Sequence, residues 1–209
     1  MPQSQGESAS RQKVMTCAAA LFAEKGFTET TIREIAAAAG IKGGSLYSHF
    51  PSKNTILEEI LEDYYSFNTN VFDDKDINGI LKENPNTEGI LKCLQLTFPP
   101  GKEEYFKTVL FILLQEQLRN PIVKKYMAEQ FILRSEKNFK KIINVLIELG
   151  AISQDTDSDY WTRAVSGLFY SFSIRMMLGI GDNAPDFSGK NMAEMLKYTI
   201  NLMFEKCGK

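Results

Sequence analysis

The 209-residue sequence predicts an all-α protein with a small three-helix head near the N-terminus and a larger helical body behind it. Two observations predict this class. Apolar residues recur at intervals of three and four over segments of helical length, and Gly or Pro marks the ends of those segments. No segment has a convincing period-two alternation or hairpin signal, so no sheet is expected. We expect the head to cover residues 1–53 and the body residues 54–209.

The first helix is expected over residues 10–25, where it would brace the segment that follows. Gly26 and Phe27 form a helix-ending pattern in which the Phe27 ring can cover Phe22. The apolar face of this helix consists of Val14, Cys17, Ala18, Leu21 and Phe22.

A second helix is expected to begin after Thr31. Thr31 and Glu34 have the spacing of a capping box, in which the hydroxyl and the carboxylate each accept a backbone N–H of the other residue. Gly40 supplies the left-handed position that ends the helix, and Ile41 can fold back over this end. The apolar stripe of the helix consists of Ile32, Ile35, Ala36 and Ala39.

A third helix of about two turns is expected between Lys42 and Pro51, because proline lacks the amide donor needed to continue it. Leu46 and Phe50 would point inward from it at a spacing of four. So short a helix is not stable alone and needs a scaffold to hold its polar face. The outward residues are Lys42, Gly43, Gly44, Ser45, Tyr47, Ser48 and His49.

Two short helices in this arrangement are typical of a helix-turn-helix, which places the start of its second helix in a DNA major groove. Adjacent glycines allow close backbone approach, Ser45 can bond a base edge, and Tyr47 and His49 can reach phosphates. Lys42 and Lys53 add positive charge at both ends of this helix. The alternative is an ordinary helical hairpin in which Tyr47 and His49 are surface aromatics.

Composition and charge narrow the function classes. With 44% hydrophobic and 24% charged residues, neither disorder nor a membrane span is indicated. The net charge is −2, but residues 1–53 carry +2 and the remainder −4, as expected of a DNA-binding head on another kind of body. Three widely spaced cysteines, best read as small buried hydrophobes, favour a reducing cytoplasm. The single histidine, His49, argues against a zinc site, a catalytic triad and an enzyme, and no cofactor is expected.

From Gln12 to Leu57 the sequence resembles the N-terminal domain of the tetracycline-repressor (TetR) family. The strings LFAEKGF, TTIREIAAAAG and GGSLYSHFPSK carry this resemblance. Many relatives have Ser at the position of Lys42 and a basic residue at that of Gly43. This chain therefore departs from the family pattern at two positions that are expected near base edges. The resemblance implies phosphate contacts from Thr31, Tyr47, His49 and Lys53, and positions at or near base edges for Lys42, Gly43, Gly44 and Ser45.

The body is expected to begin with a helix capped by Ser52 that leaves the head. It breaks at residues 73–76, and a second loop follows at 84–86; whether a helix lies between them stays open. A helix after Gly101 is apolar on every side in its middle, and Pro121 can start a long helix over residues 122–149.

Asp157 is expected to cap a further helix that begins at residue 158, although Asp155 and Asp157 could instead be metal-binding carboxylates. This helix and the last one, residues 191–206, carry broad apolar faces. Apolar surface in excess implies a partner. The faces consist of Trp161, Val165, Leu168, Phe169, Phe172 and Met176, and of Met192, Met195, Leu196, Thr199, Ile200 and Met203, with Tyr198, Leu202 and Phe204 on further sides.

The TetR resemblance suggests that the partner is a second copy, held through the last two helices, so that two heads meet an inverted-repeat operator. It also implies a ligand cavity in the body. The candidate apolar residues, each of which could be ordinary core, are Phe106, Phe111, Tyr126, Met127, Phe131, Trp161, Phe169 and Phe172. The candidate polar contacts are Gln115, Glu116, Arg134 and Arg175. Arg175 could instead form an ion pair at the rim or the dimer interface.

Together with the TetR resemblance, these features predict a dimeric, ligand-responsive transcriptional regulator, with a helix-turn-helix DNA-binding domain over residues 1–53 and a helical ligand-binding and dimerisation domain over residues 54–209. We expect a repressor that a small apolar or aromatic molecule releases from double-stranded DNA, with the fourth helix coupling body to head. Two alternatives remain. One is an activator or DNA-organising protein of the same fold, and the other is a small helical enzyme or adaptor that lacks DNA binding.

Overall fold

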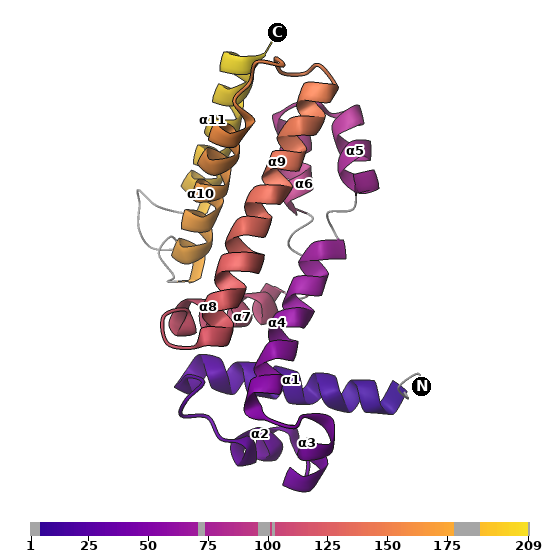
Figure 1. The fold of residues 1–209 in the computed structure, drawn as a ribbon, viewed down its shortest axis with the longest axis vertical. Helices are drawn as coiled ribbons and strands as arrows, with labels where there is room; N and C mark the ends of the chain where they lie inside the picture. Colours follow the sequence, from indigo (N-terminus) through magenta and orange to yellow (C-terminus); the bar gives the residue numbers. More distant parts are fainter. Residues whose placement is uncertain (1–4, 71–73, 96–100, 102, 178–188, 209) are drawn as a thin grey trace. The chain divides into compact units, whose positions relative to one another are not determined.

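The computed structural model describes residues 5–70, 74–95, 101, 103–177 and 189–208 (Figure 1). These residues form helices and connecting turns without a strand, which confirms the predicted all-α class. The chain divides into two compact units. Unit 1 comprises Met1–Ser66 and Gly101–Met127, and unit 2 comprises Phe67–Pro100 and Ala128–Lys209. The predicted functional boundary after residue 53 stays a prediction.

Unit 1 contains the predicted three-helix head together with helices that come later in the chain. α1 lies between α2 on one side and α7 on the other (Figure 1). The helices are α1 (Gln5–Lys25), α2 (Ile32–Ala39), α3 (Gly43–His49), α4 (Lys53–Asn70, which continues into unit 2), α7 (Glu103–Glu116) and α8 (Pro121–Tyr126). The fully buried side chains of unit 1 include Phe22, Ile35, Leu46, Phe50, Ile56 and Leu57.

Local hydrogen bonds cap the helices of unit 1 at positions that the sequence predicted. Thr31 and Glu34 form the capping box at the start of α2. Gly40 has a φ of 68°, and the amides of Gly40 and Ile41 donate to carbonyls of the last turn, a Schellman ending. Ser52 Oγ accepts the amide of Thr55 at 3.1 Å, which confirms the predicted cap of α4. Short-range sequence signals are therefore sufficient to define these helices.

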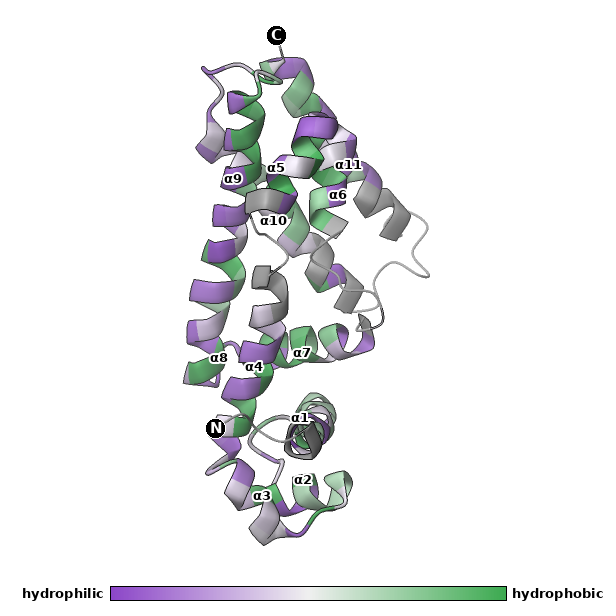
Figure 2. Cartoon of the chain, turned by 90° about the vertical axis from the view of Figure 1, so that its right-hand side faces the viewer, coloured by the Kyte–Doolittle hydropathy of each residue, from purple (hydrophilic) through white to green (hydrophobic). Residues whose placement is uncertain are grey.

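Unit 2 packs three long helices with two short ones around one core. α9 contacts α10 and α5, and α10 and α6 both contact α11. Figure 2 shows polar and apolar residues alternating around α9 and α11, as in helices that bury one face. The helices are α5 (Asp74–Glu83), α6 (Thr87–Gln95), α9 (Leu133–Glu148), α10 (Ser158–Met177) and α11 (Gly189–Cys207). α5 thus answers the open question of a helix between the two loops.

The predicted helix over residues 122–149 is helical throughout from Pro121 to Glu148, but part of it is not α-helical. α8 ends at Tyr126, and a π-helical segment, η1 (Met127–Ile132), precedes α9. A π-helix adds a residue to the turn and shifts the helix face, so the 3.6-residue period on which the prediction relied does not reveal it. Ser135 Oγ donates to the Phe131 carbonyl at 2.5 Å where η1 passes into α9.

The predicted cap of the helix after residue 157 can be checked in the described part of the chain. Asp157 Oδ1 accepts the amide of Tyr160 at 2.9 Å, so Asp157 caps α10 as predicted. The described residues include no cluster of three or more side chains suited to a metal ion. Nor do the described helices include one that is both long enough and apolar enough to cross a membrane.

Candidate nucleic-acid interface

The outward face of α3 carries most of the predicted DNA contacts. Leu46 and Phe50 are fully buried beneath it, as predicted, whereas Tyr47 is 57% exposed. A side chain at Gly43 or Gly44 would meet no atom within 4 Å, so the start of α3 is open to the close approach of another molecule. Most of the predicted base and phosphate contacts are exposed, namely Thr31, Lys42, Gly43, Gly44, Ser45 and Tyr47, while His49 and Lys53 are partly buried.

Arg11 of α1 fixes the C-terminal end of α3. Its Nη1 donates to the His49 carbonyl at 2.9 Å, and its guanidinium carbon lies 4.5 Å from the centroid of the Phe50 ring. Glu59 of α4 accepts from Nε of Arg11 at 2.8 Å and pairs with its charge. Sequence analysis missed this role, because the three partners of Arg11 are distant in the chain.

Lys53 lies at the start of α4 and holds the loop between α1 and α2. Its Nζ donates to the carbonyls of Phe27, Thr28 and Thr30 at 2.6, 3.1 and 2.7 Å, and lies 4.4 Å from the Phe27 ring centroid. These three bonds use all the donors of an ammonium group. Burial lowers the pKa of Lys53, and nearby carboxylates, Glu29 first, oppose this shift. A phosphate contact from Lys53, which stays a prediction, would compete with these bonds.

Glu116, at the end of α7, also binds the loop between α1 and α2. It is only 7% exposed, and its Oε1 accepts the amide of Phe27 at 2.9 Å. Gly26 has a φ of 87°, and a Cβ there would lie 3.4 Å from this oxygen. The structure thus gives Glu116, a predicted ligand contact, a structural bond within unit 1. Lys53 and Glu116 together clamp the segment that leads into the helix-turn-helix.

The carboxylate of Glu34 joins the capping box to α1. Lys25 Nζ lies 2.7 Å from Glu34 Oε1, while Oε2 accepts the backbone N–H of Thr31 at 2.8 Å. The hydrogen bond from Lys25, followed by those from Thr31, lowers the pKa of Glu34 from 4.5 to about 2. The same hydrogen bond with Glu34 raises the pKa of Lys25.

Acid is therefore expected to destabilise the head through Glu34. Because the folded pKa is the lower one, the stabilisation is present above pH 4.5 and is lost as the pH falls towards about 2. The test is the urea midpoint of the wild type and of Glu34→Gln from neutral pH down to this range. The wild type should exceed the variant near neutrality and approach it in acid. A constant difference at every pH would contradict the assignment.

The predicted ligand residues fall into both units. In unit 1, Phe106 and Met127 are buried, Phe111 and Tyr126 are partly buried, and Gln115 is exposed. Tyr64 and Phe106 stack with ring centroids 4.8 Å apart. Their close packing is also what an ordinary core provides.

In unit 2, Phe131 and Phe169 line a pocket, whereas Trp161 belongs to the buried core. Arg134 and Arg175 are partly buried, and burial lowers the pKa of Arg134. The side chain of Phe172 lies outside the described residues. The pocket also includes Arg163, which sequence analysis did not select.

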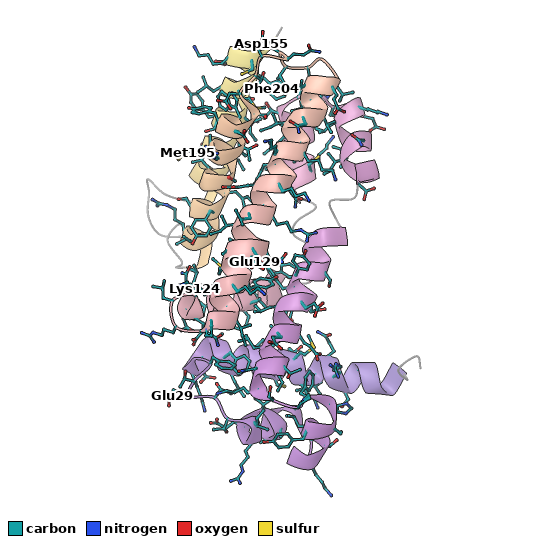
Figure 3. All side chains as sticks on the ribbon, viewed as in Figure 1. Glu29, Lys124, Glu129, Asp155, Met195 and Phe204 are labelled. Carbon is teal, nitrogen blue, oxygen red and sulfur yellow. The ribbon has the colours of Figure 1, made fainter. Side chains whose placement is uncertain are left out.

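Exposed apolar residues lie on the last two helices, as predicted. Met195 and Tyr198 of α11 are 48% and 69% exposed, and Tyr160 of α10 is 60% exposed. Figure 3 marks Met195 and Phe204 on α11. The side chains of Met176 and Met192, which the prediction included, lie outside the described residues.

The N-terminal part of the chain matches known proteins in sequence. Residues 14–60 match the family described as bacterial regulatory proteins, tetR family. A relative, the HTH-type transcriptional repressor KstR2 of Rhodococcus jostii, is 51% identical over 59 residues, which are 28% of this chain and 29% of that protein. The matched part thus spans less than a third of the curated relative's length.

Solved structures are similar over nearly the whole chain. A transcriptional regulator from Saccharomonospora viridis, solved in complex with choline, has a TM-score of 0.70 at 21% identity, with 93% of this chain and 96% of that chain covered. The ketosteroid regulator KstR2 of Mycobacterium tuberculosis has a TM-score of 0.58 at 25% identity, with 95% of each chain covered. The similarity to the choline-bound structure concerns the fold alone.

Proposed function

Because the chain belongs, through residues 14–60, to the TetR family of bacterial regulatory proteins, we propose that it represses transcription by binding an inverted-repeat operator as a dimer. The observation that carries the proposal is the outward face of α3. It presents an open glycine pair and an exposed Tyr47, and it is supported from below by the buried Leu46 and Phe50. A rigid helix with an open start is what major-groove recognition requires.

A second copy would bind through α10 and α11. The support for this interface is the exposure of Tyr160, Met195 and Tyr198, large apolar side chains that water solvates poorly. The modest positive charge of one head is a further reason for two. Two heads related by a two-fold axis would contact half-sites about one helical turn apart, or a multiple of that spacing.

A small molecule would release the DNA by favouring a body conformation that separates the heads. Structural neighbours include a regulator solved with choline, which supports a ligand response without identifying the ligand of this chain. Within unit 1, Glu116 connects α7 to the loop before α2, so a ligand that moves α7 would disturb the helix-turn-helix.

The proposal can be tested by sequencing fragments of the source genome that the purified protein captures at two salt concentrations. A few inverted-repeat sites should survive the higher salt, because phosphate-dominated non-specific binding weakens faster than specific binding. Many degenerate sites would favour the DNA-organising alternative. No enriched site at either salt would contradict DNA binding as the function.

Tyr47→Ala and Ser45→Ala should weaken binding in different ways. If Tyr47 contacts phosphate, its loss reduces affinity about equally for all DNA sequences. If Ser45 contacts a base edge, its loss changes the preference among operator variants, where a wrong base pair ordinarily costs about 1–3 kcal/mol. The measurement is the affinity of each variant for a library of operator mutants. Identical selectivity profiles for the two variants would refute the assignment.

A further inference from the structure

A pocket of about 140 Å³ lies in unit 2 between helical segments that meet near the start of α9. The π-helical segment η1 contributes Phe131 to it, α9 contributes Glu136, and α10 contributes Arg163, Gly167 and Tyr170. π-helical turns often occur at functional sites, because they redirect side chains that a regular helix would point elsewhere. The volume of the pocket is below that of pockets for drug-sized molecules, which suits a small ligand.

Aromatic rings form the walls of this pocket. Phe131 and Tyr170 approach edge to face, with centroids 5.9 Å apart and ring planes at 65°. Phe169 also lines the pocket and contacts Phe139, a buried residue of the core, at a centroid distance of 5.9 Å. The core thus supports one wall, and the rings offer faces and edges to a further aromatic ring.

Gly167 lines the pocket without adding a side chain to it. It lies in the interior of α10, where glycine is less favourable than alanine by about 1 kcal/mol. A Cβ at this position would meet no atom within 4 Å. The helix therefore has a poor helix former at an exposed position that lines the pocket, where a Cβ would meet only open space.

Opposite charges line the same pocket without neutralising each other. Among the described residues, neither Arg163 nor Glu136 makes an ion pair within 4 Å. Asp159, four residues before Arg163, is paired with Lys140 at 2.7 Å, and the Arg163 charge adds to the lowering of the Asp159 pKa without forming a second ion pair. An apolar pocket with one unpaired cation and one unpaired anion matches a ligand that carries both charges.

We propose that this pocket binds a single-ring aromatic molecule that carries a carboxylate and an ammonium group, as aromatic amino acids do. The ring lies against Phe131 and Tyr170, the carboxylate pairs with Arg163, and the ammonium pairs with Glu136. This assignment deepens the proposed ligand response and rests on it for its effect on DNA binding. The binding step itself can be measured without DNA.

The test is calorimetric titration of the full chain with phenylalanine, 3-phenylpropionate, which lacks the ammonium, and phenethylamine, which lacks the carboxylate. Phenylalanine should bind at least about tenfold more tightly than either, because each charge-assisted bond contributes to affinity. Equal binding of the three compounds, or no binding of any, would overturn the proposal.

Single substitutions test which side chain pairs with which charged group of the ligand. Arg163→Gln should reduce the affinity for phenylalanine to that for phenethylamine, and Glu136→Gln should reduce it to that for 3-phenylpropionate. Gly167→Leu should abolish binding of all three compounds because it fills the pocket. Gly79→Leu is the matched control, since Gly79 is an exposed glycine in α5 that also has no atom within 4 Å of its Cβ position. Loss of binding in this control, or unchanged binding in Gly167→Leu, would refute the site.

The regulatory consequence is a separate readout. If phenylalanine binds and weakens the affinity for captured operator fragments in the wild type, and Glu136→Gln, on α9 and outside the proposed α10 and α11 interface, needs more phenylalanine for the same effect, both the pocket and the proposed ligand response are supported. Binding that leaves operator affinity unchanged would retain the pocket and overturn its role in the response. Operator capture without any binding of the three compounds would overturn the pocket and leave the proposed DNA binding intact.

Discussion

Phe50→Ala should lower the free energy of unfolding of the DNA-binding head by about 3–5 kcal/mol, the usual effect of deleting a buried phenylalanine ring. Phe50 is fully buried beneath α3, and the Arg11 guanidinium lies over its ring. Removing the ring leaves a cavity and deprives Arg11 of a contact, so α3 loses support at its C-terminal end. Urea denaturation measures the loss of stability, and operator binding should be lost with it.

Tyr47→Ala is the matched control, because Tyr47 lies on the same short helix but is 57% exposed. Its stability should stay within about 0.5 kcal/mol of the wild type, as for most surface substitutions. Its DNA affinity should still fall, so the pair of variants separates folding from recognition. A stability loss in Phe50→Ala no larger than that in Tyr47→Ala would contradict the packing of α3 described above.

Glu116→Ala should destabilise unit 1 by about 1–3 kcal/mol, because it removes a part-buried hydrogen bond and leaves the amide of Phe27 without this acceptor. Glu116→Gln retains a side-chain carbonyl oxygen and should lose much less. Both the urea midpoint and the operator affinity should be measured, at a temperature where each variant remains folded. We expect Glu116→Ala to weaken operator binding, because the loop that leads into α2 then loses its bond to α7 and keeps those from Lys53 and Thr30.

The neighbouring Gln115 supplies the control for Glu116. Gln115 is exposed on the same helix, so Gln115→Ala should leave both stability and operator affinity close to those of the wild type. Equal effects of the two alanine variants would show that the bond to Phe27 contributes little to the head.

The helices of the head could be predicted from the sequence with one correction, since α1 begins at Gln5, five residues before the predicted start. Their ends depend on groups only three or four residues apart, such as Thr31 with Glu34, or on one residue with a special backbone, such as Gly40 and Pro51. Interactions over so short a span depend on neighbouring residues and not on the rest of the fold. The direction of Leu46 and Phe50 followed from their spacing in the same way.

The supports of that head could not be predicted from the sequence. Glu116 is 89 residues from Phe27, and Arg11 is 38 residues from His49. A single sequence gives no signal that such residues meet. The π-helical segment η1 was missed for a related reason, since one additional residue in a turn leaves both flanking apolar patterns intact.

By itself, then, the sequence determined the all-α class, the capped helices of the head and the outward face of α3, because each depends on helical periodicity or on contacts within one turn. Only the tertiary structure decided which distant side chains hold that face in place, and which of the candidate ligand residues share a pocket. It brought Arg163 and Glu136 of two different helices to one aromatic pocket. The physical reason is that packing joins residues by distance in space, which local spacing along one helix does not encode.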